Sequence, residues 1–254
     1  MKIATKKVLY QMGVMPRLEI IRHAVSRSRW SRKIREERQF YKPFVKRGDL
    51  VFDVGVNRGF KSVVFRQMGA RVVGVEPLEE CAAELRQRFD HDPHFTLEQK
   101  ALGDKEGVAE MGRAEVSAMC SLSETWQELG RTSRDDVIEV AVTTMDHLIA
   151  KHGEPDFCKL DVEGYEPEVL SGLNVPLKAM SFEFTPHVSK LAVRCIERIE
   201  SLGHYEYNKS PMHAGNMCME LDRWINGNKM IDLMQQIEVE GDMTGGDIYV
   251  RRVA

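Results

Sequence analysis

From residue 48 onward, apolar positions alternate between short continuous runs and helical spacing. The run at 50–54 has the character of a buried strand, and residues 60–68 follow a helical spacing; each ends at a glycine. A second strand at 71–75 and a second helix at 77–89 repeat the pattern. This alternation predicts parallel strands joined by right-handed crossovers, and therefore an α/β fold.

Similar patterns continue toward the C-terminus. Helical spacing predicts a short helix at 168–171, opened by Pro167, and a longer one at 188–201. Residues 209–246, rich in Met, Gly and Asn, show no readable pattern. Apolar runs predict further strands at 95–99, 137–142, 157–160, 181–184, 205–207 and 247–251.

The N-terminal segment has a different pattern. Pro16 opens a stretch with one apolar face, which predicts a helix, and a second, very basic helical stretch carries Trp30 and Ile34. We therefore predict a basic helical N-terminal extension, residues 1–47, followed by one catalytic domain, residues 48–254.

Charge separates these two parts. Residues 1–47 hold fourteen Lys and Arg and three Glu, a net charge of +11, whereas the rest of the chain carries −14. Such a segment suits nucleic acid, an anionic membrane surface, or the acidic remainder of the same protein. Nucleic acid is the least favoured of the three, because few aromatic residues stand among the basic ones. Weak contact with an anionic membrane surface stays open.

Composition indicates a soluble globular protein. The 254 residues, 43% hydrophobic and 30% charged, suffice for one full-sized core. We find no secretory signal and no apolar run near the roughly 18 residues of a membrane span. Five scattered cysteines without CxxC spacing predict idle thiols rather than disulfides or a zinc site. We expect a cytoplasmic protein, at most peripheral to the inner membrane surface.

A ligand-binding loop is predicted at residues 53–59, DVGVNRG, where the first strand turns into a helix. Gly55 and Gly59 leave room for a ligand against the backbone, and the helix amides favour a negatively charged group. A dinucleotide-binding fold would carry GxGxxG here. This loop instead has GxxxG with Asn57 in the middle, and it resembles the first motif of Rossmann-like methyltransferases, which lies against the methionine part of S-adenosylmethionine (SAM).

Glu76 ends the second predicted strand, seventeen to twenty-one residues beyond the glycine loop. A carboxylate there can accept hydrogen bonds from both ribose hydroxyls of a nucleoside, each worth about 1.5–3 kcal/mol. The alternative is a solvated Glu that begins a helix. Because Pro77 fixes the turn, we favour the ribose role.

Three later segments extend the resemblance: ALGDKEG at 101–107, TTMD at 143–146 and KLDVEGYEPEVLSGL at 159–173. In this order, after DVGVNRG and the VEP at 75–77, they resemble the FkbM-type methyltransferase family. The resemblance covers about residues 48–185, and a weaker similarity is found at Gly246-Asp247-Ile248-Tyr249. The segment that begins at Lys159 is the most specific part.

The resemblance implies a Rossmann-like class I methyltransferase sheet of seven strands, mostly parallel with the last strand antiparallel. It also implies SAM as cofactor and, usually, transfer to an oxygen of a small molecule or sugar. The chain departs from the family at Arg58, at Phe60 and Lys61, and at Met145. Arg58 and Lys61 disturb a neutral cofactor pocket unless they point to solvent. The predicted SAM contacts are Asp53, Gly55, Asn57, Gly59, Ser62, Glu76, Leu102 and Asp161.

Asp161 is the best catalytic candidate. It follows the strand at 157–160, at the edge where open α/β sheets bind their ligands. Glu163 lies two residues on, and the pair can divide cofactor contact and proton removal, since neighbouring carboxylates raise one pKa. Alternatively, Asp161 caps the next helix and Glu163 faces water. Lys159 neutralises Asp161 in either case.

Two further residues follow the strand at 181–184. His187 has an ordinary pKa near 6.5 that suits proton transfer, although a lone loop histidine is more often incidental. Glu183 is a candidate for binding the acceptor. Together with Asp161 and Glu163 it has the oxygen ligands that Mg²⁺ prefers, but the spacing fits no familiar metal loop, and we predict no metal.

The sequence therefore predicts a SAM-dependent O-methyltransferase that acts on a hydroxyl of a small molecule or glycan. An NAD-dependent oxidoreductase is an alternative that the missing GxGxxG disfavours. A catalytically inactive SAM-fold module, acting as a scaffold through its basic arm, is a second alternative. The retained glycine loop and Glu76 argue against it.

Overall fold

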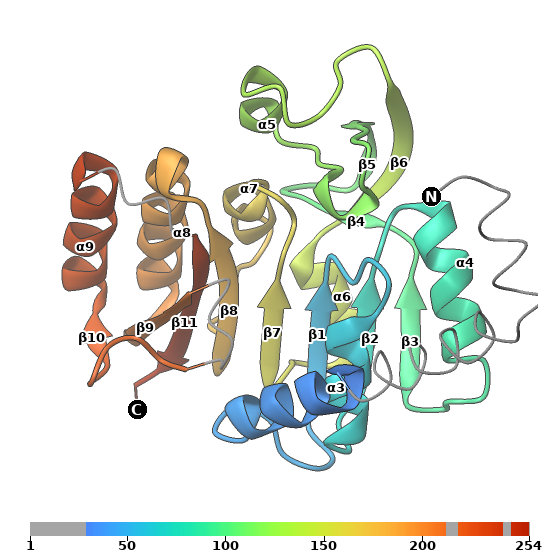
Figure 1. Cartoon of the computed structure of the whole chain (residues 1–254), viewed down its shortest axis with the longest axis horizontal. Helices are drawn as coiled ribbons and strands as arrows, with labels where there is room; N and C mark the ends of the chain where they lie inside the picture. The colour runs from blue at the N-terminus through green and yellow to red at the C-terminus, as the bar shows by residue number, and fades with distance from the viewer. Residues whose placement is uncertain (1–28, 212–217, 241–244, 254) are drawn as a thin grey trace, which may run out of the picture.

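The computed structural model describes residues 29–211, 218–240 and 245–253. These residues form one large sheet with helices on both faces and a small sheet above one end (Figure 1). The helix predicted from Pro16 lies outside the described residues.

The large sheet is the predicted α/β arrangement. Strands β3, β2, β1, β7 and β8 run parallel, and β11 pairs antiparallel with both β8 and β9. The antiparallel last strand is thereby confirmed, and a two-residue strand, β10, extends the seven strands at the edge. In sheet order the strands are β10 (Ile225–Asn226), β9 (Tyr205–Pro211), β11 (Gly246–Arg252), β8 (Ala179–Phe184), β7 (Phe157–Leu160), β1 (Leu50–Val54), β2 (Arg71–Val75) and β3 (Phe95–Glu98).

A small sheet of three strands lies over the carboxyl ends of the large one (Figure 1). Its strands are β4 (Ala101–Leu102), β6 (Val137–Thr143) and β5 (Gly107–Gly112). The strand predicted at 137–142 is therefore real and belongs to this second sheet. The labelled helices are α3 (Phe60–Gln67), α4 (Glu79–Arg88), α5 (Glu124–Glu128), α6 (Met145–His152), α7 (Glu166–Ser171), α8 (Ser189–Leu202) and α9 (Gly227–Glu240).

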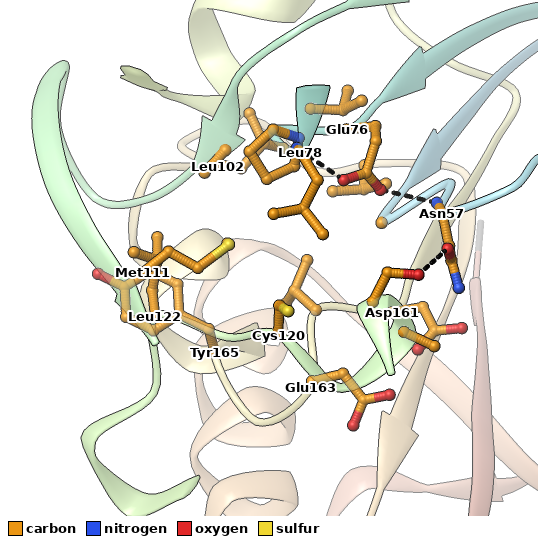
Figure 2. Close-up of a pocket in the computed structure, with 18 of the residues that line it drawn as sticks. Asn57, Glu76, Leu78, Leu102, Met111, Cys120, Leu122, Asp161, Glu163 and Tyr165 are labelled. Atoms are coloured by element: carbon orange, nitrogen blue, oxygen red, sulfur yellow. Dashed lines mark hydrogen bonds between the residues drawn. The ribbon is translucent and has the colours of Figure 1, made fainter. Parts of the chain in front are cut away.

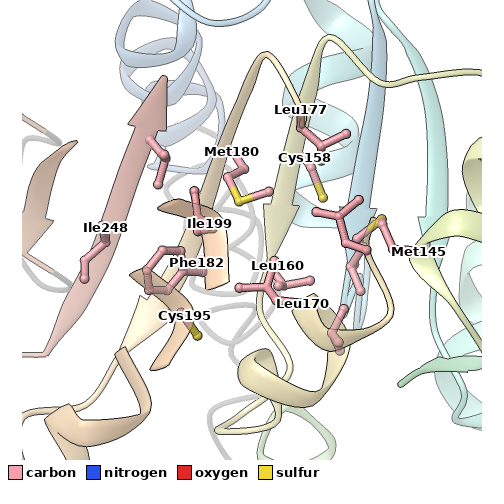
Figure 3. Packing of buried hydrophobic residues seen from close by; sticks show 14 of the residues in the cluster. Met145, Cys158, Leu160, Leu170, Leu177, Met180, Phe182, Cys195, Ile199 and Ile248 are labelled. Atoms are coloured by element: carbon pink, nitrogen blue, oxygen red, sulfur yellow. The ribbon is translucent and has the colours of Figure 1, made fainter. Parts of the chain in front are cut away.

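Alternating residues of the central strands supply two separate cores. Cys158 and Leu160 of β7 point to the face covered by α6, α7, α8 and α9, where Phe182 and Met145 join them (Figure 3). Phe157 of the same strand belongs to the core on the opposite face. Burial on both faces explains why these strands read as continuous apolar runs.

The opposite face is covered by α3 and by a helix at residues 29–41. Tyr41, at the end of that helix, is fully buried. Its ring meets those of Phe65 and Phe157 edge-on at 4.9 and 5.7 Å between centroids, and its hydroxyl lies 3.3 Å from the hydroxyl of Tyr249. Residues 29–41 are thus packed onto the sheet through an aromatic cluster.

No helix among the described residues is long and apolar enough to cross a bilayer. All five cysteines are free thiols.

Tyr41→Ala should lower the free energy of unfolding by roughly 3–5 kcal/mol, because it leaves a cavity among Phe65, Phe157 and Tyr249. Urea unfolding followed by circular dichroism measures the change. Val108→Ala, at a side chain that is 66% exposed, is the control and should stay within about 0.5 kcal/mol of wild type. Equal stability of the two variants would mean that the helix at 29–41 adds little to the fold.

Candidate active site

A pocket of about 530 Å³ lies at the carboxyl ends of β1, β2 and β7. Residues from the small sheet and from a 3₁₀ turn, η1 (Ser117–Met119), form its other side. Figure 2 shows acidic and amide side chains toward one end and apolar side chains toward the other. Six of the predicted site residues line the pocket together: Gly55, Asn57, Glu76, Leu102, Asp161 and Glu163.

The two glycines of the loop serve its packing. Both have left-handed backbone, with φ of +78° at Gly55 and +84° at Gly59. A Cβ at Gly55 would lie 1.7 Å from the carbonyl oxygen of Asp161, and one at Gly59 would lie 2.7 Å from Leu85 of α4. Protein atoms rather than open ligand space therefore explain both glycines, and Gly59 does not line the pocket.

Glu76 is held rigidly beside this loop. Its two carboxylate oxygens accept hydrogen bonds from the backbone N–H of Asn57, at 2.7 Å, and of Leu78, at 2.9 Å (Figure 2). Burial raises the pKa of Glu76 to about 7, although both hydrogen bonds act to lower it. With 4% of its surface exposed, Glu76 is not a solvated helix-start residue. Its remaining lone pairs can accept from hydroxyl groups in the pocket.

Besides Gly59, three predicted site residues lie outside the pocket lining, namely Asp53, Ser62 and His187. Ser62 donates to Asp53 at 2.6 Å, and both are buried where α3 packs on β1. Burial raises the pKa of Asp53 against the lowering effect of that hydrogen bond. His187 is exposed in a second 3₁₀ turn, η2 (Pro186–Val188). The structure thus brings Asp53 and Ser62 together behind the loop and leaves His187 apart.

Arg58 of the loop and Lys61 of α3 also stay outside the pocket lining. Arg58 is exposed and pairs with Glu84 of α4. The Lys61 ammonium lies 2.5 Å from Glu37, in the helix at 29–41. The pocket is therefore free of both cations.

Two acids of the pocket lining, Asp161 and Glu163, belong to an acidic cluster. Carboxylate oxygens of Asp161, Glu163 and Glu183 all lie within 4.8 Å of one another. The ammonium of Lys159 lies 2.7 Å from Asp161 and 3.8 Å from Asp247. Burial acts to raise the pKa of Asp161, but the Lys159 charge and hydrogen bond outweigh it and hold that pKa below its ordinary value.

The other two acids of the cluster behave differently. Burial, reinforced by the Asp161 charge, raises the pKa of Glu163 to about 7, while a hydrogen bond from the Trp126 indole at 3.3 Å opposes the rise. The same two causes raise the pKa of Glu183 well above its usual range. Because the Lys159 ammonium already neutralises Asp161, we assign no metal to the cluster.

Backbone geometry fits a functional role for these residues. Glu163 and Asn57 are the non-glycine residues with positive φ in the described chain, at +54° and +49°. Such strain clusters at binding and catalytic sites. α7 begins at Glu166 without a side-chain cap, so Asp161 is not a helix cap.

Apart from Leu102, the side chains of the apolar wall were not found from the sequence. Ser117 of η1 also donates to the Asn57 side-chain oxygen at 3.1 Å, which fastens the 3₁₀ turn to the glycine loop. In β5 the alternation of apolar and polar residues could have indicated Met111 as a wall residue. Val108, an apolar residue that faces outward, obscures that alternation. The wall side chains are Leu78, Met111, Cys120, Leu122 and Tyr165 (Figure 2).

Comparison with known proteins decides the family. Residues 53–224, more than half of the chain, match the family model of the methyltransferase FkbM domain. The chain belongs to the FkbM methyltransferase family. Its fold and family are those of SAM-dependent methyltransferases, and SAM is its cofactor. The match favours this prediction over the NAD-dependent oxidoreductase.

No curated protein matches this FkbM-family chain. Similar solved structures include precorrin-6y C5,15-methyltransferase from Geobacter metallireducens, at 10% identity and TM-score 0.44, covering 82% of both chains. A SAM-dependent O-methyltransferase from Thermotoga maritima has 14% identity and TM-score 0.40, covering 83% of this chain and 61% of its own. Aeropyrum pernix fibrillarin in complex with SAM has 13% identity and TM-score 0.40, covering 82% and 68%.

The pocket of the FkbM-family chain fits SAM in its chemistry. Leu78, Leu102 and Met111 offer an apolar wall to a flat base, and Glu76 offers acceptors to a ribose diol. The ionised Asp161 lies at the end where a positively charged sulfonium and ammonium are favoured. An apolar wall, a ribose-type acceptor and an ionised carboxylate in one pocket are therefore compatible with SAM.

Glu76→Ala should weaken SAM binding at least tenfold, about 1.4 kcal/mol, because the carboxyl oxygens that accept from hydroxyl donors are lost. Isothermal titration calorimetry measures the dissociation constant. Glu79→Ala, at a largely exposed acid in the first turn of α4, is the control and should bind as wild type does. Unchanged binding in folded Glu76→Ala would exclude the ribose role.

Proposed function

We propose that the chain transfers the SAM methyl group to a hydroxyl oxygen of a small molecule or glycan. In this proposal Asp161 lies beside the transferred methyl and Glu163 removes the hydroxyl proton. The observation that supports this proposal is the pair of carboxyl groups of Asp161 and Glu163. Two carboxyl groups line one pocket, one ionised by Lys159 and the other with a pKa raised to about 7.

Methyl transfer requires alignment more than covalent participation by the protein. SAM supplies a methyl group on a sulfonium, which is a good leaving group. Holding the acceptor in line can contribute about 7–11 kcal/mol to lowering the barrier. The buried pocket, with its strained Asn57 and Glu163 backbone, supports such fixed placement.

The need for a base favours an oxygen acceptor. A hydroxyl keeps its proton at neutral pH, so a positioned base accelerates its methylation by roughly 10²–10⁴-fold. A group with pKa near the working pH is best suited to that role, which supports Glu163. Glu183, whose carboxylate lies within 4.8 Å of those of Asp161 and Glu163, is our candidate for contact with the acceptor.

The proposal predicts methyl transfer from SAM carrying a ¹³C-methyl group to members of a panel of sugars and hydroxylated small molecules. The wild-type rate should rise as pH increases through about 7, because Glu163 must lose its proton to act as a base. Glu163→Gln should lower the rate by roughly 10²–10⁴-fold and flatten that rise. Nuclear magnetic resonance of the product methyl reports the atom that received it.

Glu168→Gln, on α7 and ion-paired with Arg194, is the matched control and should keep wild-type activity. A methyl group found on nitrogen would overturn the hydroxyl acceptor. SAM binding without any product from the panel would support the inactive binding module instead.

We also propose that residues 1–47 act as a basic extension to the methyltransferase domain at 48–254 and touch anionic membrane surfaces weakly. Arg29, Arg32 and Arg35 are exposed on the helix whose other side buries Ile34. Lys or Arg near an anionic surface contributes about 1 kcal/mol each.

Replacing Arg29, Arg32 and Arg35 together by Gln should reduce sedimentation with phosphatidylserine-containing vesicles, and added salt should do the same to wild type. Arg86→Gln, at an exposed cation of α4, is the control and should sediment like wild type. Binding that ignores both anionic lipid and salt would refute membrane contact. If RNA alone retained the protein, and did so in a salt-sensitive manner, the basic surface would be assigned to nucleic-acid binding instead.

A further inference from the structure

Lys159 is a buried cation in the middle of the acidic cluster. It stands on β7, two residues before Asp161, and only 2% of its surface is exposed. Residues two apart on a strand point to the same face, so the ammonium and the Asp161 carboxylate meet, at 2.7 Å. A buried ammonium is tolerated where anions surround it.

Several carboxyl groups lie near Lys159 in the sheet. Asp53 of β1 is its register partner, Asp161 follows it on β7, and Asp247 of β11 lies 3.8 Å away. Ser181, its partner on β8, is buried, and its hydroxyl oxygen has no hydrogen-bond partner. Glu183 of β8 adds a further carboxyl group beside Asp161.

Two further cations lie near the cluster. The Lys61 ammonium of α3 pairs with Glu37, and the Arg131 guanidinium, which lies 4.7 Å from the centre of the Trp126 ring, acts to lower the pKa of Glu163. The Tyr41 and Tyr249 hydroxyls meet each other. Carboxyl groups therefore outnumber the cations near them. Since charges this close interact strongly when buried, the carboxyl groups cannot all be ionised together.

Position decides which of them holds a proton. Asp161 is the member of the acidic cluster that hydrogen-bonds to the ammonium, so ionisation is favoured there first. Glu163 and Glu183 lie within 4.8 Å of that negative charge, and ionising either would place like charges together.

We propose that Lys159 is a positioning residue that keeps Asp161 ionised and so places the proton of the cluster on Glu163 and Glu183. This inference rests on the proposed function, in which Glu163 is the base, for its catalytic meaning. The placement of the proton itself concerns the protein alone. The KLDVEG segment then acts as a unit in which Lys159 sets the state of Asp161, and Asp161 sets that of Glu163.

The test is a pH titration of side-chain carboxyl ¹³C signals in the SAM-free full chain, with Asp161→Asn and Glu163→Gln used to assign the two signals. In wild type, Asp161 should titrate below its usual range and Glu163 near 7. Lys159→Met should raise the Asp161 midpoint by at least two pH units, a 100-fold gain in proton affinity. Lys159→Arg, which keeps the charge, should leave it low.

Lys178→Met is the matched control. Its lysine pairs with Asp156 at 2.6 Å but is mostly exposed, and the variant should leave the Asp161 midpoint unchanged. An unmoved Asp161 midpoint in Lys159→Met would overturn the proposal.

A second measurement covers the case in which Lys159→Met does not fold. Asp161→Asn removes the neighbouring negative charge, so the Glu163 midpoint should fall by one pH unit or more. A Glu163 midpoint that stays in place would equally overturn the proposal. If the titrations behave as expected while Glu163→Gln keeps full methyl transfer, the proposed base fails and the role of Lys159 in placing the proton stands.

Discussion

The close approach of the loop after β1 to the end of β7 is the constraint on which the site depends. Gly55 touches the Asp161 carbonyl, where a Cβ would stand 1.7 Å from the oxygen, and the Asp161 N–H bonds back to the Val54 carbonyl at 3.0 Å. The contact joins the segment that presents Asn57 to the segment that presents Glu163. A side chain at Gly55 would separate the cofactor side of the pocket from its acidic side.

Much of this was readable from the sequence, because the central strands are buried on both faces and their parallel order forces functional residues to one edge. Glu76, Asp161 and Glu163 follow from that rule. The small sheet does not, because β5 pairs with β6 across an intervening loop and exposes Val108. In α9, Met230, Met234 and Ile237 do have helical spacing, but the surrounding Gly and Asn hid it. The apolar walls of the pocket depend on the long-range pairing of β5 with β6.

Side chains near the end of the same strand can point to different faces of the sheet. Asp53 precedes the end of β1 and points, like Val51, to the face beneath α3, where Ser62 meets it. That pair supports the loop from behind. The alternation of side chains along β1, rather than closeness in sequence, separates Asp53 from its neighbour Val54, which lines the pocket.

The aromatic docking of the helix at 29–41 has a practical consequence for anyone shortening the protein. A version that begins at residue 48 would keep all the residues that match the family model, yet it would uncover Phe65, Phe157 and Tyr249 on one side of the sheet. Exposed apolar surface of that kind promotes self-association. It would also remove Glu37, the ion-pair partner of Lys61. Lys61 lies in the first turn of α3, directly after the glycine loop. Soluble expression of the domain therefore depends on keeping a segment that the family resemblance does not include.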